Sequence, residues 1–413
     1  MRPNSTIAFL RENAPWLGAG WMLTFSSSFG QTYFIAIFSG EIRETYGLSH
    51  GSWGLFYGLG TIASAMSLIW LGALTDRFRV RELGTWVLLG FACACLAMAA
   101  LPGAWALPFV IFALRLSGQG MMAQMAMSSM ARWFVATRGR AISLIGTGFA
   151  TGEALLPMLF VALMGVLPWR SLWVIAAVYL LCLIPLVRHL LRTERVPGGT
   201  ADDDSAPGLE NRHWTRAQVL RHRGFWLILP AMIGIPSFMT AVMFHQVHYA
   251  DLKGWTHLQF TSLLPVYTAV SITTMLLSGG LIDRFSATRM ITVFQLPVVL
   301  AFLSFAWADL PWAVLSYMLA GLGIGCFMTL PAAYLAETYG TRHIGAIKAL
   351  FSSVLVFGTA LGPIITGALI DAGVNFLDQL VWIAGYFVLS SGLAVAAVAA
   401  NRAGSPMPRP PVA

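Results

Sequence analysis

The sequence predicts an all-α membrane protein with twelve transmembrane helices, arranged as two six-helix bundles related by a pseudo-twofold axis. Hydrophobic residues make up 57% of the 413 residues and charged residues only 10%, a composition too apolar for a soluble globular domain. Apolar runs of about 20 residues recur along the whole chain, and each can cross a hydrocarbon core of about 30 Å. A short acidic motif occurs once in each half, so the halves are predicted to be repeats.

Hydropathy and turn residues divide the chain into its apolar spans. The predicted spans are 14–38, 52–74, 83–101, 105–131, 141–166 and 170–190 in the first half, and 224–249, 258–281, 288–308, 311–337, 344–370 and 376–400 in the second. The two bundles are therefore expected at 1–190 and 224–400. An even number of spans places both termini on the same side of the membrane.

The distribution of Lys and Arg predicts that this side is the cytoplasm. All but four of the 25 basic residues then lie in or beside cytoplasmic segments, the exceptions being Arg43, Arg115, Arg170 and Lys253. This asymmetry is the positive-inside rule. The N-terminal residues have no signal-peptide h-region or cleavage site before the first span, so we expect that span to be retained.

The polar segments, the net charge and the cysteines limit which functions and binding partners the sequence supports. Segment 191–223 is predicted to be a cytoplasmic linker, more simply a flexible tether than a regulatory module, and 401–413 a disordered tail. A net charge of +8 does not indicate nucleic acid, because the arginines fall between apolar runs. The four cysteines lie inside apolar runs and are expected to be packing residues. No Gly-x-Ser-x-Gly, zinc-ligand cluster or phosphate loop occurs, so we expect no enzyme activity and no cofactor.

The repeat is carried by GALTDRFRVR at 72–81 and GGLIDRFSATR at 279–289, which end the second and eighth spans. The residues that correspond are Gly72 and Gly279, Asp76 and Asp283, Arg77 and Arg284, Gly118 and Gly323, Gly120 and Gly325, Gly152 and Gly358, and Pro157 and Pro363. A doubled six-helix unit is typical of transporters built from two halves.

These motifs resemble the loop 2–3 and loop 8–9 signatures of the major facilitator superfamily. RLSGQG at 115–120 resembles its span-four arginine motif, and GTALGPIITG at 358–367 resembles its glycine-proline motif. SSFGQTYF, RWFVATRGRA and HIGAIKALF look most like bacterial uptake carriers distantly akin to the monocarboxylate and oxalate/formate branches. Those branches place an arginine in span eight, whereas span eight of this chain has no charge, and Lys348 lies near the cytoplasmic end of span eleven.

The resemblance implies the major facilitator fold and a rocker-switch carrier, whose central cavity opens alternately to each side. It also implies a multi-pass protein of the bacterial inner membrane, with the lipid bilayer and a small-molecule substrate as its partners. We expect a monomer.

Two ionisable residues lie deep in predicted spans, where a charge costs several kcal/mol and is a functional candidate by default. Arg115 in span four and Glu153 in span five both fall near the midplane, and we expect them to form a buried pair facing the cavity. Gln119 is one helical turn from Arg115 and shares its face. In a proton symporter Glu153 would take a proton from outside and free Arg115 to bind an anionic substrate group. A structural pair that never titrates is the alternative.

Other polar and aromatic side chains are expected to reach the cavity. They are Gln31 and Tyr33 in span one, Tyr57 in span two, Phe238, His245 and Gln246 in span seven, and Tyr267 in span eight. His245 is close to the outer end of its span, where it is a candidate gate or proton sensor, although an interfacial histidine is more often simply solvated.

At the cytoplasmic side two clusters of charges are predicted to latch the halves. The first is Gly72, Asp76, Arg77, Arg132, Arg138 and Arg140, and the second is Gly279, Asp283, Arg284, Glu337 and Arg342. The two glycines are expected to permit close helix approach, and the alternative for the charges is anchoring of loops at the headgroups. Spans five and eleven are expected to bend and pack tightly at Gly152, Pro157, Gly358, Gly362 and Pro363.

The sequence thus favours a proton-coupled importer of a small organic anion, of the carboxylate type, facing Arg115. Uptake of a neutral or planar aromatic nutrient such as a vitamin is the alternative, as is efflux of drugs or metabolites. A non-transporting sensor is less favoured, because 191–223 and the tail contain no sizeable signalling domain.

Overall fold

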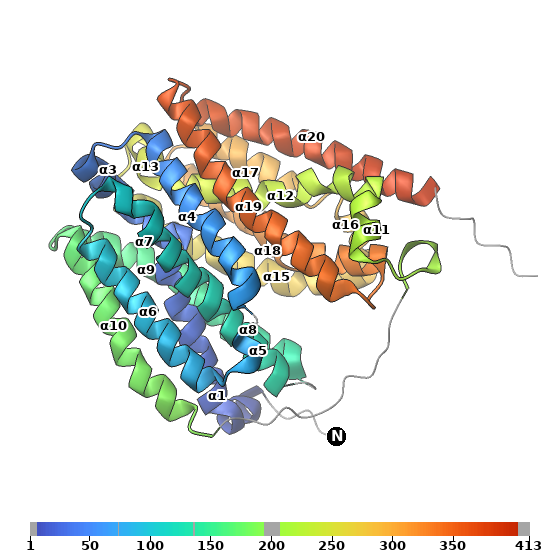
Figure 1. Ribbon diagram of the computed structural model, residues 1–413. Coiled ribbons are helices and arrows are strands. Elements are labelled where there is room, and N and C mark those ends of the chain that lie inside the picture. The colour runs from blue at the N-terminus through green and yellow to red at the C-terminus, as the bar shows by residue number, and fades with distance from the viewer. Residues whose placement is uncertain (1–5, 73, 135–136, 194–206, 404–413) are drawn as a thin grey trace, which may run out of the picture. The chain divides into compact units, whose positions relative to one another are not determined.

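The computed structural model describes residues 6–72, 74–134, 137–193 and 207–403 (Figure 1). Every regular element in these ranges is a helix. Residues 194–206 of the predicted tether and 404–413 of the predicted disordered tail lie outside the described residues. By its internal contacts the chain divides into two compact units. Unit 1 is Met1–Asp202, Met243–Ser262 and Pro363–Asp371, and unit 2 is Asp203–Val242, Leu263–Gly362 and Ala372–Ala413.

Within the described ranges, ten helices are long and apolar enough to cross a membrane. The remaining two predicted spans are interrupted. Span one leaves the α-helical conformation at Ser27 and becomes extended at Gln31, where φ is −87° and ψ is 155°. Span nine consists of the short helix Ala287–Met290, a turn at 291–295 and the 12-residue helix Leu296–Trp307. The predicted all-α, twelve-span membrane fold is confirmed with these two irregular members.

Unit 1 contains the helices of the first half and two short segments from the second. Its helices are α1 (Thr6–Ser26), η1 (Ser27–Gly30), α2 (Thr32–Ile35), η2 (Ala36–Phe38), α3 (Ser39–Tyr46), α4 (His50–Leu71), α5 (Leu74–Arg77), α6 (Val80–Ala99), η3 (Ala104–Ala106), α7 (Leu107–Leu114), η4 (Arg115–Met122), α8 (Ala123–Trp133), α9 (Arg138–Met164), α10 (Trp169–Leu190), α13 (Gln246–Lys253) and α14 (His257–Thr261). Helices α6 and α10 pack along one another, as do α1 and α9 (Figure 1).

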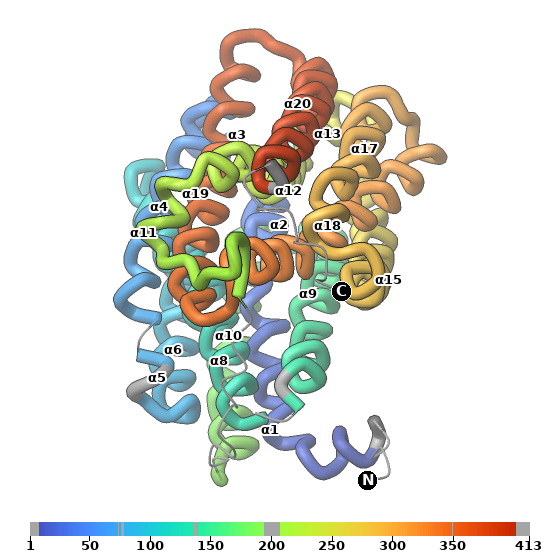
Figure 2. Tube along the Cα trace, turned by 90° about the vertical axis from the view of Figure 1, so that its right-hand side faces the viewer, coloured from blue at the N-terminus to red at the C-terminus, as the bar shows by residue number. Residues whose placement is uncertain are grey.

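Unit 2 contains most of the second half and the described end of the linker. Its helices are η6 (Leu209–Asn211), α11 (Arg216–Arg221), α12 (Arg223–Phe244), α15 (Leu264–Phe285), α16 (Ala287–Met290), α17 (Leu296–Trp307), α18 (Leu310–Tyr339), α19 (Ile344–Asp371) and α20 (Phe376–Ala403). The ends of α12 and α19, from Met243 and from Pro363 onward, belong to unit 1. Helix α18 packs between α15 and α17, and α17 packs on α20 (Figure 2).

Equivalent glycine contacts occur inside each unit, as the sequence repeat predicts. In unit 1 a Cβ at Gly152 of α9 would overlap Ser28 Oγ. In unit 2 a Cβ at Gly358 of α19 would lie 2.5 Å from Ser237 Oγ, and one at Gly362 would overlap the Ser237 carbonyl. These glycines therefore let α9 and α19 lie directly against the segments that contain the two serines.

Candidate functional site

The centre of unit 1 is built where the interrupted span one meets span four. A Cβ at Gly118 would lie 2.8 Å from Gly30 Cα, and a Cβ at Gly30 would overlap the Leu114 carbonyl. Only two glycines allow the backbones to come this close. Span four is π-helical from Arg115 to Met122, and such segments are frequent at functional sites because they re-aim side chains.

Arg115 lies at the start of this π-helical segment and is 1% exposed. Its Nη1 donates to the Gly30 carbonyl and to Thr32 Oγ1, both at 3.3 Å. Among the described residues Nε and Nη2 have no hydrogen-bond partner. A guanidinium carries five N–H donors, and leaving donors unpaired in a buried site costs about 1–3 kcal/mol or more. The site is thus prepared to receive an acceptor.

One face of α4 lies beside this arginine. The Arg115 guanidinium is 5.4 Å from the centre of the Tyr57 ring, and the Tyr57 hydroxyl shares a short hydrogen bond with Thr32 Oγ1. Trp53 and Thr61 lie one helical turn on either side of Tyr57. The Trp53 indole N–H and the Thr61 hydroxyl are also buried without a hydrogen-bond partner among the described residues. Unsatisfied polar groups therefore lie on both sides of Tyr57, each within about 6 Å along the helix.

Glu153 and Gln119, predicted to act with Arg115, are both half-buried in unit 1. Gln119 is in the π-helical segment, four residues after Arg115. Glu153 follows Gly152, whose contact with Ser28 places this part of α9 against η1. Arg115 bonds to Gly30 at the other end of η1, so the two ionisable residues lie on helices that contact the same short segment. Their ion pair stays a prediction.

The remaining predicted cavity residues of span one are buried. Gln31 is the extended residue that separates η1 from α2. The Tyr33 hydroxyl donates to Ser28 Oγ at 2.9 Å, and the Tyr33 carbonyl accepts from Gln246 Nε2 at 3.0 Å. Gln246 Oε1 lies 3.4 Å from His257 Nε2. Tyr33 and Gln246 are therefore held by protein groups.

Near the predicted outer end of unit 1 three histidines form what we call the histidine cluster, His50, His245 and His248. The ring centres of His50 and His248 are 4.2 Å apart, and those of His50 and His245 are 5.8 Å apart. His245 is 2% exposed, and its Nε2 is 3.0 Å from Thr366 Oγ1. Beside the cluster, Asp371 Oδ2 accepts a hydrogen bond from the Gly51 N–H at 2.8 Å. The cluster joins the start of α4 to α13 and to the end of α19.

The electrostatics of this cluster disfavour added positive charge. Burial lowers the pKa of His248 below its ordinary value, and the positive charge of Arg43 lowers it further, while Asp251 acts in the opposite direction. Within the described ranges no group of three or more His, Cys, Asp or Glu side chains is arranged to hold a metal ion. Burial and Arg43 therefore favour the neutral form of His248 in the folded state.

Phe238 and Tyr267, predicted for the cavity, lie in unit 2. The Phe238 ring is 4.9 Å from the ring of Tyr386 and 6.0 Å from that of Phe387. The Tyr267 ring contacts Tyr317 edge-on, with centres 6.5 Å apart. Both are packed in aromatic clusters of unit 2.

The first cytoplasmic cluster is anchored by backbone and ring contacts. Arg132 Nη2 donates to the Thr75 carbonyl at 2.6 Å, and the Arg140 guanidinium is 4.7 Å from the centre of the Phe9 ring. Gly72 ends α4 and donates its N–H to the Leu68 carbonyl. The side chains of Asp76, Arg77 and Arg138 lie outside the described residues.

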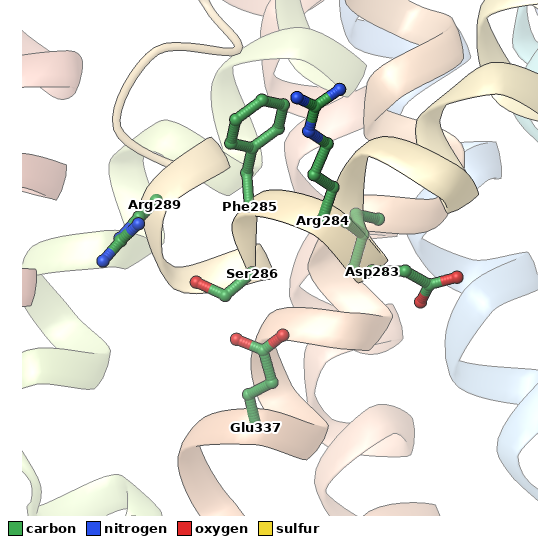
Figure 3. A pocket seen from close by; sticks show the side chains of 7 residues that line it. Asp283, Arg284, Phe285, Ser286, Arg289 and Glu337 are labelled. Atoms are coloured by element: carbon green, nitrogen blue, oxygen red, sulfur yellow. The ribbon is translucent and has the colours of Figure 1, made fainter.

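Three members of the second cytoplasmic cluster, Asp283, Arg284 and Glu337, line a pocket of about 530 Å³ (Figure 3). Glu337 points at the turn between α15 and α16, where its carboxylate accepts from the N–H of Ala287 and from the N–H and hydroxyl of Thr288, at 2.8–3.1 Å. Ser286, in that turn, has a φ of 68°. The charged group of Arg284 points away from Glu337 in Figure 3 and lies 5.3 Å from the Phe285 ring centre.

Two members of this cluster, Arg342 and Gly279, take no part in the hydrogen bonds of Glu337. Arg342 is exposed in the turn before α19. A Cβ at Gly279 would meet no described atom within 4 Å, so the close approach that the sequence predicts at this glycine is not seen among the described residues. The reason is that this face of α15 is open there.

Sequence reasoning missed several residues of these sites. Gly30, Thr32, Trp53 and Thr61 complete the surroundings of Arg115, and His50, His248 and Asp371 complete those of His245. One signal was present in the sequence: Trp53, Tyr57 and Thr61 recur at the four-residue spacing of one helix face. The other contacts join segments far apart in the chain.

Comparisons with known proteins agree with this architecture. A family profile described as Major Facilitator Superfamily matches residues 20–363 and 254–412. No curated protein matches the chain.

Similar solved structures include a bacterial homolog of the human lysosomal transporter Spinster and the nucleoside transporter NupG. The Spinster homolog, in an inward-facing and occupied conformation, is 15% identical with a TM-score of 0.73, over 92% of this chain and 96% of that one. Its inward-facing and unoccupied form is 15% identical with a TM-score of 0.73, over 96% of this chain and 99% of that one. A point mutant of NupG is 14% identical with a TM-score of 0.68, over 94% of this chain and 99% of that one. At these identities the likeness shows the fold.

Proposed function

The chain belongs to the Major Facilitator Superfamily, and on that premise we propose that it is a secondary active transporter that takes up a small organic anion by alternating access. The observation that carries this proposal is Arg115, which is buried with Nε and Nη2 unbonded among the described residues. A carboxylate of the substrate would supply both acceptors in the bidentate geometry that guanidinium groups favour. The likeness of short motifs to the monocarboxylate and oxalate/formate branches agrees with a carboxylate substrate.

Glu153 is our candidate for the proton-coupling group. It shares the η1 contact region with Arg115, and a carboxyl group at that depth can be neutral or charged depending on its partners. In the cycle we propose, protonation of Glu153 leaves the guanidinium free for the anion, and release of the proton inside favours release of the substrate. The protein would work as a monomer in the bacterial inner membrane, with both termini cytoplasmic.

Uptake into proteoliposomes tests both parts of this proposal. The substrate is first found by thermal shift with a panel of small carboxylates, since a ligand at 100 Kd stabilises by about 2.7 kcal/mol. Arg115→Gln is expected to abolish uptake, whereas Arg170→Gln, which removes a charge from another part of unit 1, is expected to retain it. Glu153→Gln is expected to remove the stimulation of uptake by an inward proton gradient. Unchanged gradient dependence in that variant would disprove the proton role.

A planar aromatic nutrient is a second candidate, and the aromatic wall beside Arg115 favours it. Phe244 lies 4.7 Å from Tyr57 and is stacked on Trp53 at 5.5 Å between ring centres. Aromatic rings of this kind can sandwich a flat ligand. For a neutral substrate, Arg115→Gln weakens uptake without abolishing it, and Tyr57→Leu has the larger effect. The same uptake assay therefore separates the two substrate classes.

A further inference from the structure

A basic pocket lies at the end of unit 1 that is predicted to be cytoplasmic, where α6 begins and α10 ends. It has a volume of about 350 Å³ and is lined by Arg81, Ile184, Pro185, Arg188, His189 and Arg192. None of these lining residues is acidic. Three guanidinium groups thus face one pocket with no carboxylate among its lining residues.

The side chain of Arg188 is held by hydrogen bonds within unit 1. Arg188 Nη1 donates to Thr85 Oγ1 at 3.3 Å, and Thr85 Oγ1 donates to the Arg81 carbonyl at 2.8 Å. This chain of bonds holds Arg188 of α10 beside the first turn of α6. Arg81 Nε is buried without a hydrogen-bond partner among the described residues. Several guanidinium groups lining one pocket, together with the unbonded Arg81 Nε, favour the binding of an anion there.

The surroundings of the pocket select the kind of anion. Residues on the same two helices expose large apolar side chains, with Trp86 73% exposed and Val178 52% exposed. In a membrane protein such faces contact acyl chains, and Trp prefers the level of the headgroups. Leu181 of α10 is 40% exposed and lies one helical turn before Ile184 and Pro185, which line the pocket, so the basic pocket borders a lipid-facing surface.

We propose that this pocket binds the phosphate of an anionic glycerophospholipid of the cytoplasmic leaflet, with its acyl chains along α6 and α10. Basic pockets between transmembrane helices at the cytoplasmic side bind such headgroups. Phosphatidylglycerol has one phosphate and cardiolipin has two, and three arginines can neutralise either. The lipid would hold α6 to α10 at this end of unit 1. This inference does not depend on the proposed substrate.

The test is lipid binding to the whole purified protein in neutral detergent. Native mass spectrometry counts bound phosphatidylglycerol, cardiolipin and phosphatidylcholine, and thermal shift gives the apparent Kd. Each arginine near an anionic surface strengthens binding about fivefold. The triple variant Arg81→Gln, Arg188→Gln and Arg192→Gln is therefore expected to weaken binding of phosphatidylglycerol about a hundredfold. A matched triple of equal charge, Arg216→Gln, Arg221→Gln and Arg223→Gln, is expected to bind as the wild type does.

Two further measurements, on single variants and with inorganic phosphate, complete the test. If the pocket triple does not fold, the exposed residues are tested singly, and Arg188→Gln or Arg192→Gln is expected to weaken binding about fivefold. Inorganic phosphate at millimolar concentration is expected neither to stabilise the protein nor to displace the lipid. Equal retention of phosphatidylcholine, no difference between the two triples, or displacement by inorganic phosphate would each overturn the proposal.

Discussion

Replacing Arg115 by methionine separates a ligand-binding role from a structural role. Both hydrogen bonds of its side chain are 3.3 Å long, beyond the usual range, so together they contribute no more than about 1–3 kcal/mol. Exchange of a buried charged group for an apolar one of similar volume is often neutral or stabilising by about 1–4 kcal/mol. The two effects offset one another. We therefore expect the unfolding free energy of Arg115→Met to lie near that of the wild type, or above it.

If Arg115 were instead the permanent partner of a buried carboxylate that never titrates, its loss would cost about 3–5 kcal/mol. For a chain of this length 1 kcal/mol corresponds to about 1 °C in Tm. The two roles therefore differ by several degrees, which thermal unfolding followed by intrinsic tryptophan fluorescence resolves. A drop of more than about 3 °C would refute the interpretation of Arg115 as an open ligand site.

Arg170 provides the matched control. Its Nη2 donates to the Tyr46 hydroxyl at 2.9 Å, and its guanidinium lies 4.3 Å from the Trp169 ring centre. Arg170→Met is expected to lower stability by about 1–2 kcal/mol, because satisfied contacts are lost. It is also expected to keep the thermal shift given by the substrate, while Arg115→Met loses it. These expectations would be contradicted if Arg115→Met were less stable than Arg170→Met, or if Arg115→Met kept the substrate-induced thermal shift and Arg170→Met lost it.

Three more predictions concern packing, pH and the cytoplasmic turn. Gly148→Ala would push a methyl group into Thr24 and is expected to lower the unfolding free energy by at least about 1–3 kcal/mol. The control Gly146→Ala, on the same helix, meets nothing within 4 Å and is expected to be neutral or slightly stabilising. Thermal unfolding of both variants checks this difference. Because burial lowers the pKa of His248, the folded state disfavours protonation of this side chain, and its contribution to stability is full above about pH 6.5 and falls below that pH. The decrease in Tm between about pH 7.5 and 5 should therefore be smaller in His248→Gln than in the wild type. An equal decrease in both proteins would contradict this prediction. Glu337→Gln weakens three hydrogen bonds to α16 by about 1 kcal/mol or more in total, so hydrogen exchange at 287–290 should rise, with Asp283→Asn as the unaffected control.

Much of the fold follows from the sequence because bilayer thickness constrains helix length directly. Apolar runs reveal the spans, basic residues indicate their orientation, and the paired glycines of spans four, five, ten and eleven indicate where helices touch. The interruption of span one at Gln31 and the π-helical turn at Arg115 depend instead on the contact between Gly30 and Gly118, which joins two spans. Hydropathy contains no information about such a contact. Both segments are apolar enough to suggest uninterrupted helices.

The sites were predictable only where a rare residue type marks them. Arg115 and Glu153 stand out because charges are rare inside spans. His50 and His248 sit among polar residues near a helix end, where a histidine is unremarkable in sequence. Their importance comes from contacts with each other and with His245, across a long stretch of chain. The hydrogen bond from Gly51 to Asp371 likewise spans 320 residues.

The two halves share their packing but not their charges, and this difference bears on mechanism. Gly152 on Ser28 and Gly358 on Ser237 are equivalent contacts. By the same correspondence, however, Ala320 stands where the first half has Arg115, and Thr359 where it has Glu153. If Arg115 and Glu153 were needed only to fix the helix arrangement, the second half would need equivalent charges for its own helices. Since its helices make the matching glycine contacts without those charges, the cost of burying Arg115 in unit 1 is better explained by a ligand than by the fold.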